Sequence, residues 1–427
     1  MLDASRPIVI DLLAEDFHER AHTLYDKLRA RSPVALVEIP QQPGRGFWMV
    51  TGYAAAEAAL RDSRLANDPR TLLTPEQRAA RARARLQGAP NTMLLSDPPE
   101  HTRLRRAAQQ AFTPRSVTAL HPAVARHAER LLSDAERAAA DGDGTVDLLH
   151  TYAYPLSLTV LGEILGFPAA WHPGLRVLAV RAATASTPLS APDPELHAQL
   201  EQYARDLVLL KRREPGDDLV SRLAYPASGS DALTDAELMA MIGLLMAAGF
   251  ETSAGLIAGA TLALLTHPEQ WAALRDDPGL AAPAVEETMR YWGPVESATT
   301  RYAIEPFELA GRRVETGDRV VVFTAAANRD PAHVPDPHAF DIHREPRPHL
   351  GFSGGIHNCM GAALARAEGR IGLTTLVARW PELRLAADPA DLRWRSGMGL
   401  RGLRRLPVRP HRHRKTEHTP QHRELEP

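Results

Sequence analysis

The sequence predicts a mainly α-helical protein with a small, segregated β region, and the main evidence is the spacing of its apolar residues. Helical periodicity dominates, and we expect helices at about residues 15–31, 53–62, 98–112, 115–140, 149–166, 192–213, 234–266 and 281–292, with a last one directly after residue 359. Shorter strand-like runs cover residues 34–39, 47–50, 301–309 and 319–323. Strands and helices do not alternate as in βαβ units, so the pattern does not fit an α/β fold.

The helical pattern runs over residues 1–408 without an internal repeat or a break typical of a domain boundary. We therefore expect one domain over residues 1–408. Residues 409–427 are polar and lack periodicity, which predicts a disordered tail.

The composition excludes several classes of partner. With 50 Lys and Arg against 52 Asp and Glu, the formal net charge is −2, which implies neither a nucleic-acid nor an anionic membrane partner. A single cysteine rules out an internal disulfide and fits a reducing cytosol. The most apolar run, Met239 to Phe250, is shorter than the roughly 18 residues of a membrane span. The N-terminus lacks a signal-peptide pattern, so we expect a soluble, cytoplasmic protein.

The longest predicted helix, residues 234–266, begins with a capping-box sequence in which Thr234 is the N-cap and Glu237 is at N3. At 1.5 Å per residue it is roughly 45–50 Å long, enough to cross the molecule. Its middle is apolar nearly all round, so it should be central. A similar sequence, Asp97-Pro98-Pro99-Glu100, predicts that Asp97 caps the helix at 98–112.

The only cysteine, Cys359, lies in the segment HLGFSGGIHNCMGAALARAEGR, where a glycine-rich loop opens a helix of small residues. Unpaired backbone N–H groups and the positive end of the helix dipole favour a thiolate at such a position. Gly354, Gly355 and Gly361 allow the backbone to approach a flat partner closely.

The residues alone leave four interpretations of Cys359. It is an inert buried thiol, a catalytic nucleophile that needs a base, a zinc ligand with His357, or the axial thiolate of a haem. The zinc interpretation requires two further ligands at recognisable spacing, and none is evident. A haem thiolate requires one cysteine only.

The cysteine segment resembles the haem-binding loop of the cytochrome P450 family, whose pattern is Phe-Gly-x-Gly-x-His-x-Cys-x-Gly. The matching residues are Phe352, Gly355, His357, Cys359 and Gly361. Ser353 stands where the family usually has glycine. The resemblance implies the P450 fold, a long central helix over haem b, and Cys359 as the axial ligand of the iron.

A second motif lies in the long helix, where Glu251 and Thr252 interrupt an apolar stretch. A carboxylate is costly there unless it is paired or used. The Thr252 hydroxyl can donate to the Ala248 carbonyl four residues back and open a local groove. The alternative is a bent helix with a solvent-facing Glu251. The segment MAAGFETS is similar to the family's Ala-Gly-x-Asp/Glu-Thr, which implies that Thr252 holds dioxygen and that Glu251 relays protons.

Further residues match family positions that stabilise the cysteine loop or contact the haem. Glu287 and Arg290 are three residues apart on one helix face and match the family's Glu-x-x-Arg, to which the resemblance adds Arg344 as a third, structural partner. The two carboxylates of a haem need compensation. The resemblance implies contacts to these propionates at His101, Arg105, Arg301 and His357.

The resemblance also implies which segments line a substrate pocket over the haem. The residues that these segments offer are Leu86, Met93, Leu94, Met246, Ala247, Ala248, Val295, Ser297, Ala298, Met398 and Leu400. Most are aliphatic, so we expect a bulky apolar substrate. Glu296 is unusual there, and either faces outward or binds a polar group of the substrate. Within the family the sequence looks most like the bacterial hydroxylases of polyketide and macrolide pathways.

The resemblance implies a monooxygenase that inserts one atom of O₂ into a C–H bond. Electrons are expected from NAD(P)H through a reductase and a ferredoxin-type partner, which a basic patch would suit. The residues of that patch are Arg103, Arg106, Arg115, Arg366 and Arg370. The alternatives are epoxidation, C–C coupling or peroxide-driven oxidation on the same fold, a non-catalytic haem binder or gas sensor, and a cysteine-dependent hydrolase.

Overall fold

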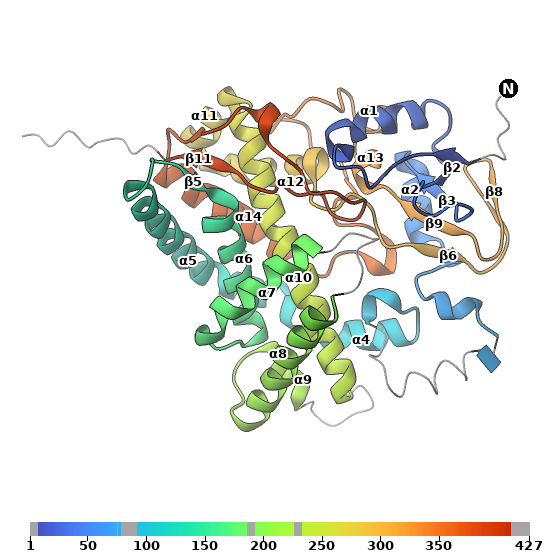
Figure 1. Cartoon of the computed structure of the whole chain (residues 1–427), viewed down its shortest axis with the longest axis horizontal. Helices are drawn as coiled ribbons and strands as arrows, with labels where there is room; N and C mark the ends of the chain where they lie inside the picture. Colours follow the sequence, from blue (N-terminus) through green and yellow to red (C-terminus); the bar gives the residue numbers. More distant parts are fainter. Residues whose placement is uncertain (1–6, 75, 78–91, 186–192, 226–232, 411–427) are drawn as a thin grey trace, which may run out of the picture.

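The computed structural model describes residues 7–74, 76–77, 92–185, 193–225 and 233–410. Most helices lie on one side of the molecule and the strands of the main sheet lie on the other, whereas β5 Val146–Asp147 and β11 Pro407–Arg409 lie on the helical side (Figure 1). This arrangement confirms the predicted mainly α fold with a segregated β region. Leu86 and the tail from residue 411 lie outside the described residues, so the predictions on them stay predictions.

Each predicted helix is present with its ends shifted by a few residues. Their bounds are α1 Phe17–Arg29, α2 Tyr53–Arg61, α4 Glu100–Gln109, α5 Pro114–Ala140, α6 Tyr154–Leu165, α8 Pro194–Arg213, α10 Asp235–Leu265, α12 Ala281–Trp292 and α14 Ala362–Arg379. The described part of the chain also contains helices that were not predicted: α7 His172–Ala185, α9 Leu219–Ala224, α11 Pro268–Asp276 and α13 Thr324–Ala327. In α11, the proline that ends the preceding pattern occupies the first turn of a new helix, where its missing N–H is tolerated.

The main sheet has six strands in the order β1-β2-β3-β9-β6-β4. Their bounds are β1 Ile8–Val9, β2 Val34–Glu38, β3 Phe47–Val50, β9 Arg319–Val322, β6 Arg301–Ala303 and β4 Leu65–Ala66. The predicted strand at 301–309 is wrong as one element, because only β6 joins this sheet. Its second half, β7 Phe307–Leu309, turns back to pair with β8 Arg312–Val314. A third sheet pairs β10 Arg384–Leu385, β11 Pro407–Arg409 and β5 Val146–Asp147.

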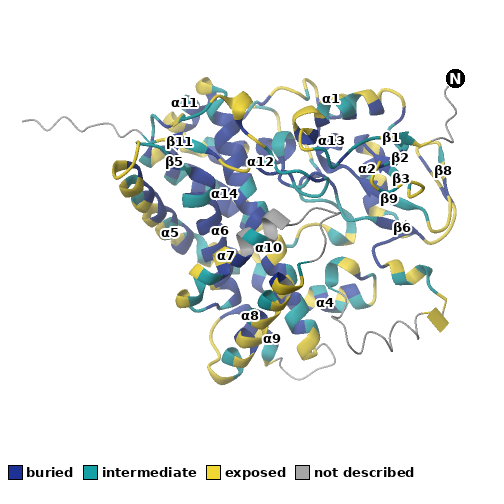
Figure 2. Cartoon of the chain, in the orientation of Figure 1, coloured by how far each residue is buried: buried dark blue, intermediate teal, exposed yellow. Residues whose placement is uncertain are grey.

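Helix α10 is the central element, as predicted. It packs against α6, α12 and α14, and Figure 2 shows buried residues concentrated around these helices. The capping box at Thr234 and Glu237 is present. Among the described residues, α10 is the one helix long and apolar enough to cross a membrane. Its central residues are buried against other helices in the core, so its apolar character has a structural explanation.

The predicted cap of α4 is wrong. Helix α4 begins at Glu100, and no side chain caps its N-terminus. The two carboxylate oxygens of Asp97 accept hydrogen bonds from the backbone N–H groups of Asn67 and Asp68, at 3.0 and 2.8 Å. The carboxylate therefore satisfies backbone donors just after β4 and joins that strand to the start of α4.

Candidate active site

A cavity opens between α10, the N-terminal part of α4 and the cysteine loop. Its lining is mostly aliphatic. The residues that contribute are Met93, Leu94, Phe112, Leu161, Leu244, Leu245, Ala248, Gly249, Thr252, Ser253, Val295, Ala298, Thr324, Leu350, Phe352, Met360 and Leu364, with His101, Arg105, His357 and Cys359 at its polar end. An apolar lining with a few convergent polar groups is typical of a buried ligand site.

The cysteine loop presents its sulfur to this cavity. The Cys359 N–H donates to the Phe352 carbonyl at 2.9 Å, which closes the loop on itself. The thiol is free and accessible from within the cavity. Burial raises the pKa of the Cys359 thiol, while the backbone N–H of Gly361 and the positive charges of two arginines oppose that rise. Gly361 also caps α14, so the sulfur lies beside the positive end of a helix.

Two residues of the loop have a left-handed backbone. Gly355 has φ +67°, and a Cβ atom there would collide with the Leu60 carbonyl of α2, so only glycine fits. Ser353 has φ +60° where the resembled pattern has glycine. The loop thus keeps its turn at Ser353 at an energetic cost.

Replacing Ser353 with glycine should stabilise the holoprotein by about 0.5–1 kcal/mol. A left-handed L-residue costs about 1–2 kcal/mol, and the greater freedom of glycine in the unfolded chain offsets about 0.5–1 kcal/mol of that gain. Urea unfolding measures the difference. Ala310→Gly, at φ +47° in the β7–β8 turn, is the matched control and should stabilise similarly. An unchanged or lower midpoint for Ser353→Gly alone would mean that the serine hydroxyl contributes to the loop.

The polar end of the cavity holds donors without acceptors. The Nδ1 atom of His101, the Nε2 atom of His357 and two guanidinium nitrogens of Arg301 are buried and have no hydrogen-bond partner among the described residues. The rings of His101 and His357 lie 4.3 Å apart. Burial, with the nearby positive groups, lowers the pKa of His357 to about 3. Buried donors are normally satisfied, so this cluster fits an anionic group that occupies the cavity.

Two haem propionates are such a group. Arg105, the fourth predicted contact, donates to the carbonyl and the side-chain oxygen of Asn358, both at 2.9 Å. It therefore joins α4 to the residue before Cys359. Three of the four predicted propionate contacts, His101, Arg105 and His357, line the cavity with Cys359. Arg301 is not among the lining residues, but it lies near enough for its charge to lower the pKa of His357. A mostly aliphatic cavity with one cysteine sulfur and this set of donors fits a haem.

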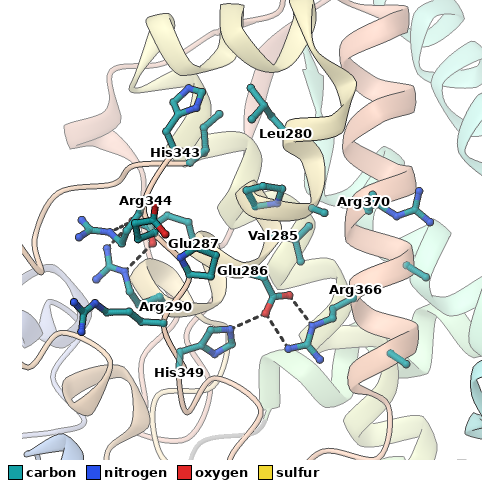
Figure 3. A pocket seen from close by; sticks show the side chains of 18 of the residues that line it. Leu280, Val285, Glu286, Glu287, Arg290, His343, Arg344, His349, Arg366 and Arg370 are labelled. Carbon is teal, nitrogen blue, oxygen red and sulfur yellow. Dashed lines mark hydrogen bonds and ion pairs between the residues drawn. The ribbon is translucent and has the colours of Figure 1, made fainter. Parts of the chain in front are cut away.

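A buried ion network supports the loop from outside. Arg290 donates from Nε and Nη2 to the two carboxylate oxygens of Glu287, at 2.8 and 2.7 Å, and Arg344 Nε lies 3.3 Å from Glu287 Oε1. Figure 3 shows these three side chains together. Arg290 also donates to the Pro337 and Ala339 carbonyls, each at 2.8 Å. The predicted three-residue network is therefore confirmed, and it ties α12 to the segment that precedes the cysteine loop.

The acid and the alcohol of α10 have different surroundings. Thr252 Oγ1 donates to the Ala248 carbonyl at 2.7 Å, as predicted, and both residues line the cavity. Glu251 is buried and forms an ion pair with Arg395, so a solvent-facing Glu251 is excluded. Burial raises the pKa of Glu251, and the charge of Arg395 opposes this. Sequence spacing had no signal for Arg395, which is 144 residues further along the chain.

Glu368 is a functional candidate that sequence analysis missed. It lies on α14, is 1% exposed, and burial raises its pKa to about 8, against the effect of the Ser157 and Ser253 hydroxyls. Ser253 lines the cavity. A carboxyl that is protonated at neutral pH beside the cavity is a second potential proton donor. In ARAEGR it resembles an ordinary charge on an exposed helix face, so only the packing of α14 reveals it.

The predicted pocket residues separate into two groups. Met93, Leu94, Ala248, Val295 and Ala298 line the cavity. The other described ones are not among its lining residues: Met246, Ala247, Ser297, Met398 and Leu400. Met246 packs in the helical core, Met398 packs toward α1, and the Ser297 hydroxyl donates to the Met398 carbonyl at 2.7 Å.

Glu296 does not face outward and does not enter the cavity. Its side chain is 0% exposed, and it contacts α1 on the far side of the pocket segment. Both sequence-based interpretations of Glu296 were therefore wrong, since neither anticipated a buried partner from the N-terminal helix.

A groove runs along the outer side of α12 and α14 (Figure 3). Arg366 donates to both carboxylate oxygens of Glu286, at 2.6 and 2.9 Å, and its guanidinium lies 4.4 Å from the centre of the Phe352 ring. His349 Nε2 lies 3.1 Å from the same carboxylate. Of the predicted basic patch, Arg366 and Arg370 line this groove, whereas Arg103 forms an ion pair with Glu237.

The site has the features of a haem enzyme: a cysteine sulfur at an apolar cavity, unsatisfied donors that fit two propionates, and the Thr252 hydroxyl in the cavity lining. A family model described as Cytochrome P450 matches residues 280–383, and the chain belongs to this family. It is 42% identical over 406 residues to cytochrome P450 monooxygenase PikC of Streptomyces venezuelae, covering 94% of each chain.

Another relative is 6-deoxyerythronolide B hydroxylase of Saccharopolyspora erythraea, 40% identical over 416 residues, with 94% of this chain and 98% of the relative covered. Among solved structures, the cytochrome P450 enzyme CxnD, for C–S bond formation in chuangxinmycin biosynthesis, has a TM-score of 0.83. Identity to it is 33%, over 96% of this chain and 98% of that one. The protein is therefore a cytochrome P450 monooxygenase that uses haem b, O₂ and electrons from NAD(P)H through redox partners.

Proposed function

We propose that the protein hydroxylates a C–H bond of a bulky apolar small molecule of the polyketide or macrolide type. The observation that supports this most directly is the aliphatic cavity wall, with Leu94, Leu244, Val295 and Ala298 facing the cavity. Relatives named for related chemistry, PikC and 6-deoxyerythronolide B hydroxylase, match nearly the whole chain. The proposed location is the cytoplasm.

In this proposal, four residues bind the haem. The Cys359 sulfur would hold the iron, the Arg301 guanidinium would compensate the charge of the propionates, and His101 and His357 would donate hydrogen bonds to them. When bound, the haem supplies the oxygen-activating chemistry, with its thiolate ligand favouring O–O cleavage. The aliphatic wall excludes water and positions the substrate C–H bond.

In the same proposal, Thr252 and Glu251 of α10 supply protons to the cavity. The Thr252 hydroxyl, which donates to the Ala248 carbonyl at rest, can rotate to donate into the cavity. Glu251 resupplies the proton, and because it is buried against Arg395, we propose that this ion pair opens before Glu251 exchanges protons with solvent.

Replacing Thr252 with alanine should uncouple the enzyme. NAD(P)H consumption should continue, while the amount of hydroxylated product per NAD(P)H falls about tenfold or more, because a positioned proton donor is lost. Thr261→Ala is the matched control, since the Thr261 hydroxyl makes the same bond to the carbonyl four residues back, at 2.8 Å, but is fully buried away from the cavity. Unchanged coupling in Thr252→Ala would remove Thr252 from the proton route.

For electron transfer we propose an acidic ferredoxin-type partner with its own reductase. The groove along α12 and α14 supports this proposal. Arg366 lines the groove, and its guanidinium packs on the Phe352 ring of the cysteine loop. The positive charge of Arg366 also acts to lower the pKa of the Cys359 thiol. Electrostatic complementarity of this kind mainly raises the association rate and weakens with salt.

The substrate class is tested by titrating the ferric holoenzyme with 6-deoxyerythronolide B, vitamin D₃ and myristic acid. We expect the macrolactone to shift the Soret band with the lowest Kd, and to give an NAD(P)H-dependent product one oxygen atom heavier. Preference for either other compound would contradict the macrolide assignment. Full turnover with hydrogen peroxide alone would contradict the proposed proton route.

A further inference from the structure

Glu296 is a buried carboxylate that the oxygen chemistry does not use. It follows α12 in the segment Pro294–Ala298, and its neighbours Val295 and Ala298 line the cavity. Its own side chain points the other way and is 0% exposed. A buried charge persists only when its surroundings compensate it, so the partners of Glu296 indicate its task.

Two partners come from α1, about 270 residues earlier in the chain. The Tyr25 hydroxyl donates to Glu296 Oε1 at 2.5 Å, and both groups are buried. His18 Nδ1 lies 3.2 Å from Glu296 Oε2, with neither side chain exposed. The pocket segment is thus fastened to the N-terminal helix through one carboxylate.

The third partner comes from a hairpin at residues 393–404, here called the C-terminal hairpin, in which Trp394 pairs with Leu403. Arg401 Nη1 lies 3.8 Å from Glu296 Oε2, and the Arg401 N–H donates to the Pro294 carbonyl at 2.8 Å. The Glu296 N–H donates to the Gly399 carbonyl at 3.0 Å. The Glu296–Arg401 contact and the backbone hydrogen bonds therefore join the same two segments, Pro294–Ala298 and the C-terminal hairpin. The Glu296 carboxylate also connects both segments to α1.

The groups around Glu296 compensate its single negative charge. Arg401 also lies 2.7 Å from His22 Nε2 and packs over the Trp394 ring at 4.7 Å, so it is fixed on several sides. Although burial by itself raises the pKa of Glu296, His18, Arg401 and Tyr25 lower it to about 2. Glu296 is therefore ionised at neutral pH, and its removal would leave Arg401 without its anion.

We infer that Glu296 is a positioning residue that sets the shape of the cavity wall at Val295 and Ala298, and with it the size of ligand accepted, by fastening this segment to α1 and Arg401. The inference rests on the proposed haem cavity. It assigns a specificity role to α1, which does not itself contribute to the cavity lining among the described residues.

Two nitrogen ligands of the haem iron that differ in size test the inference on the ferric holoenzyme. Imidazole is small and reports on the iron, whereas clotrimazole is bulky and must also contact the wall. Glu296→Gln keeps the side-chain shape and an acceptor for Tyr25 but removes the charge. We expect it to weaken clotrimazole binding about fivefold or more and to leave imidazole binding within about twofold.

Tyr25→Phe removes a single buried hydroxyl and should change the ratio of the two affinities in the same direction, which keeps the test decisive if Glu296→Gln does not fold. The matched control is Glu136→Gln. Glu136 pairs with Arg379 between α5 and α14, so its loss should lower stability without changing the affinity ratio.

An unchanged clotrimazole-to-imidazole ratio in both Glu296→Gln and Tyr25→Phe would overturn the inference and leave Glu296 with a purely stabilising role. The wild-type spectrum separates this from failure of the proposed function. Without a haem-thiolate band in the reduced, CO-bound wild type both would fail, whereas a normal band with an unchanged ratio overturns the positioning role alone.

Discussion

Cys359→Ser should abolish the red-shifted Soret band of the reduced, CO-bound protein and lower product formation by more than about 100-fold, equivalent to ~2.7 kcal/mol of barrier. Serine keeps the size and the backbone bond to the Phe352 carbonyl, but its hydroxyl does not supply the soft, electron-donating thiolate. Haem content, the CO spectrum and NAD(P)H-dependent turnover measure the change.

Met360→Leu is the control for Cys359→Ser. Met360 lines the same cavity and the substitution nearly conserves volume, so the band should be retained and stability should fall by less than about 1.5 kcal/mol. If the serine variant keeps the band of a haem thiolate, Cys359 is not the ligand.

Glu287→Gln should destabilise the holoprotein by about 3 kcal/mol and lower the fraction of protein with a haem-thiolate spectrum. Breaking a buried ion pair leaves the remaining charge uncompensated, which costs about 3–5 kcal/mol, and glutamine retains part of the hydrogen bonding. Arg290 is 5% exposed at its side chain, so solvent does not replace the lost partner. Urea unfolding and the CO spectrum report the two effects.

The adjacent Glu286 provides the matched comparison. Its ion pair with Arg366 is 42% and 44% exposed, and such pairs contribute less than about 1 kcal/mol. Glu286→Gln should therefore have a small effect on stability. Equal effects of the two substitutions would show that burial of the Glu287 network does not determine its contribution.

Much of the fold could be predicted because it is encoded locally. Periodic apolar residues placed α10 and α12 within one residue of their observed bounds. The errors arose where contacts between distant segments determine strand pairing or the partner of a side chain. The run at 301–309 divides between two sheets because β6 pairs with β9 whereas β7 pairs with β8, and Asp97 binds the backbone after β4 instead of capping α4.

In the candidate site, too, contiguous motifs could be predicted from the sequence, whereas contacts between distant segments could not. The loop around Cys359 and the pair Glu251–Thr252 are contiguous motifs, so the sequence alone was enough to propose the ligand and the acid–alcohol pair. The sequence could not identify Arg395 as the partner of Glu251, because that ion pair joins α10 to the C-terminal hairpin.

By itself the sequence determined the family and the haem cofactor and pointed to Cys359 as the proposed ligand, because these depend on residues that are neighbours along the chain. Only the tertiary structure decided that Glu368 is buried and that Glu296 faces α1 instead of the substrate. The physical reason is that the ionisation and direction of a carboxylate depend on desolvation and on partners that packing brings together from distant parts of the chain.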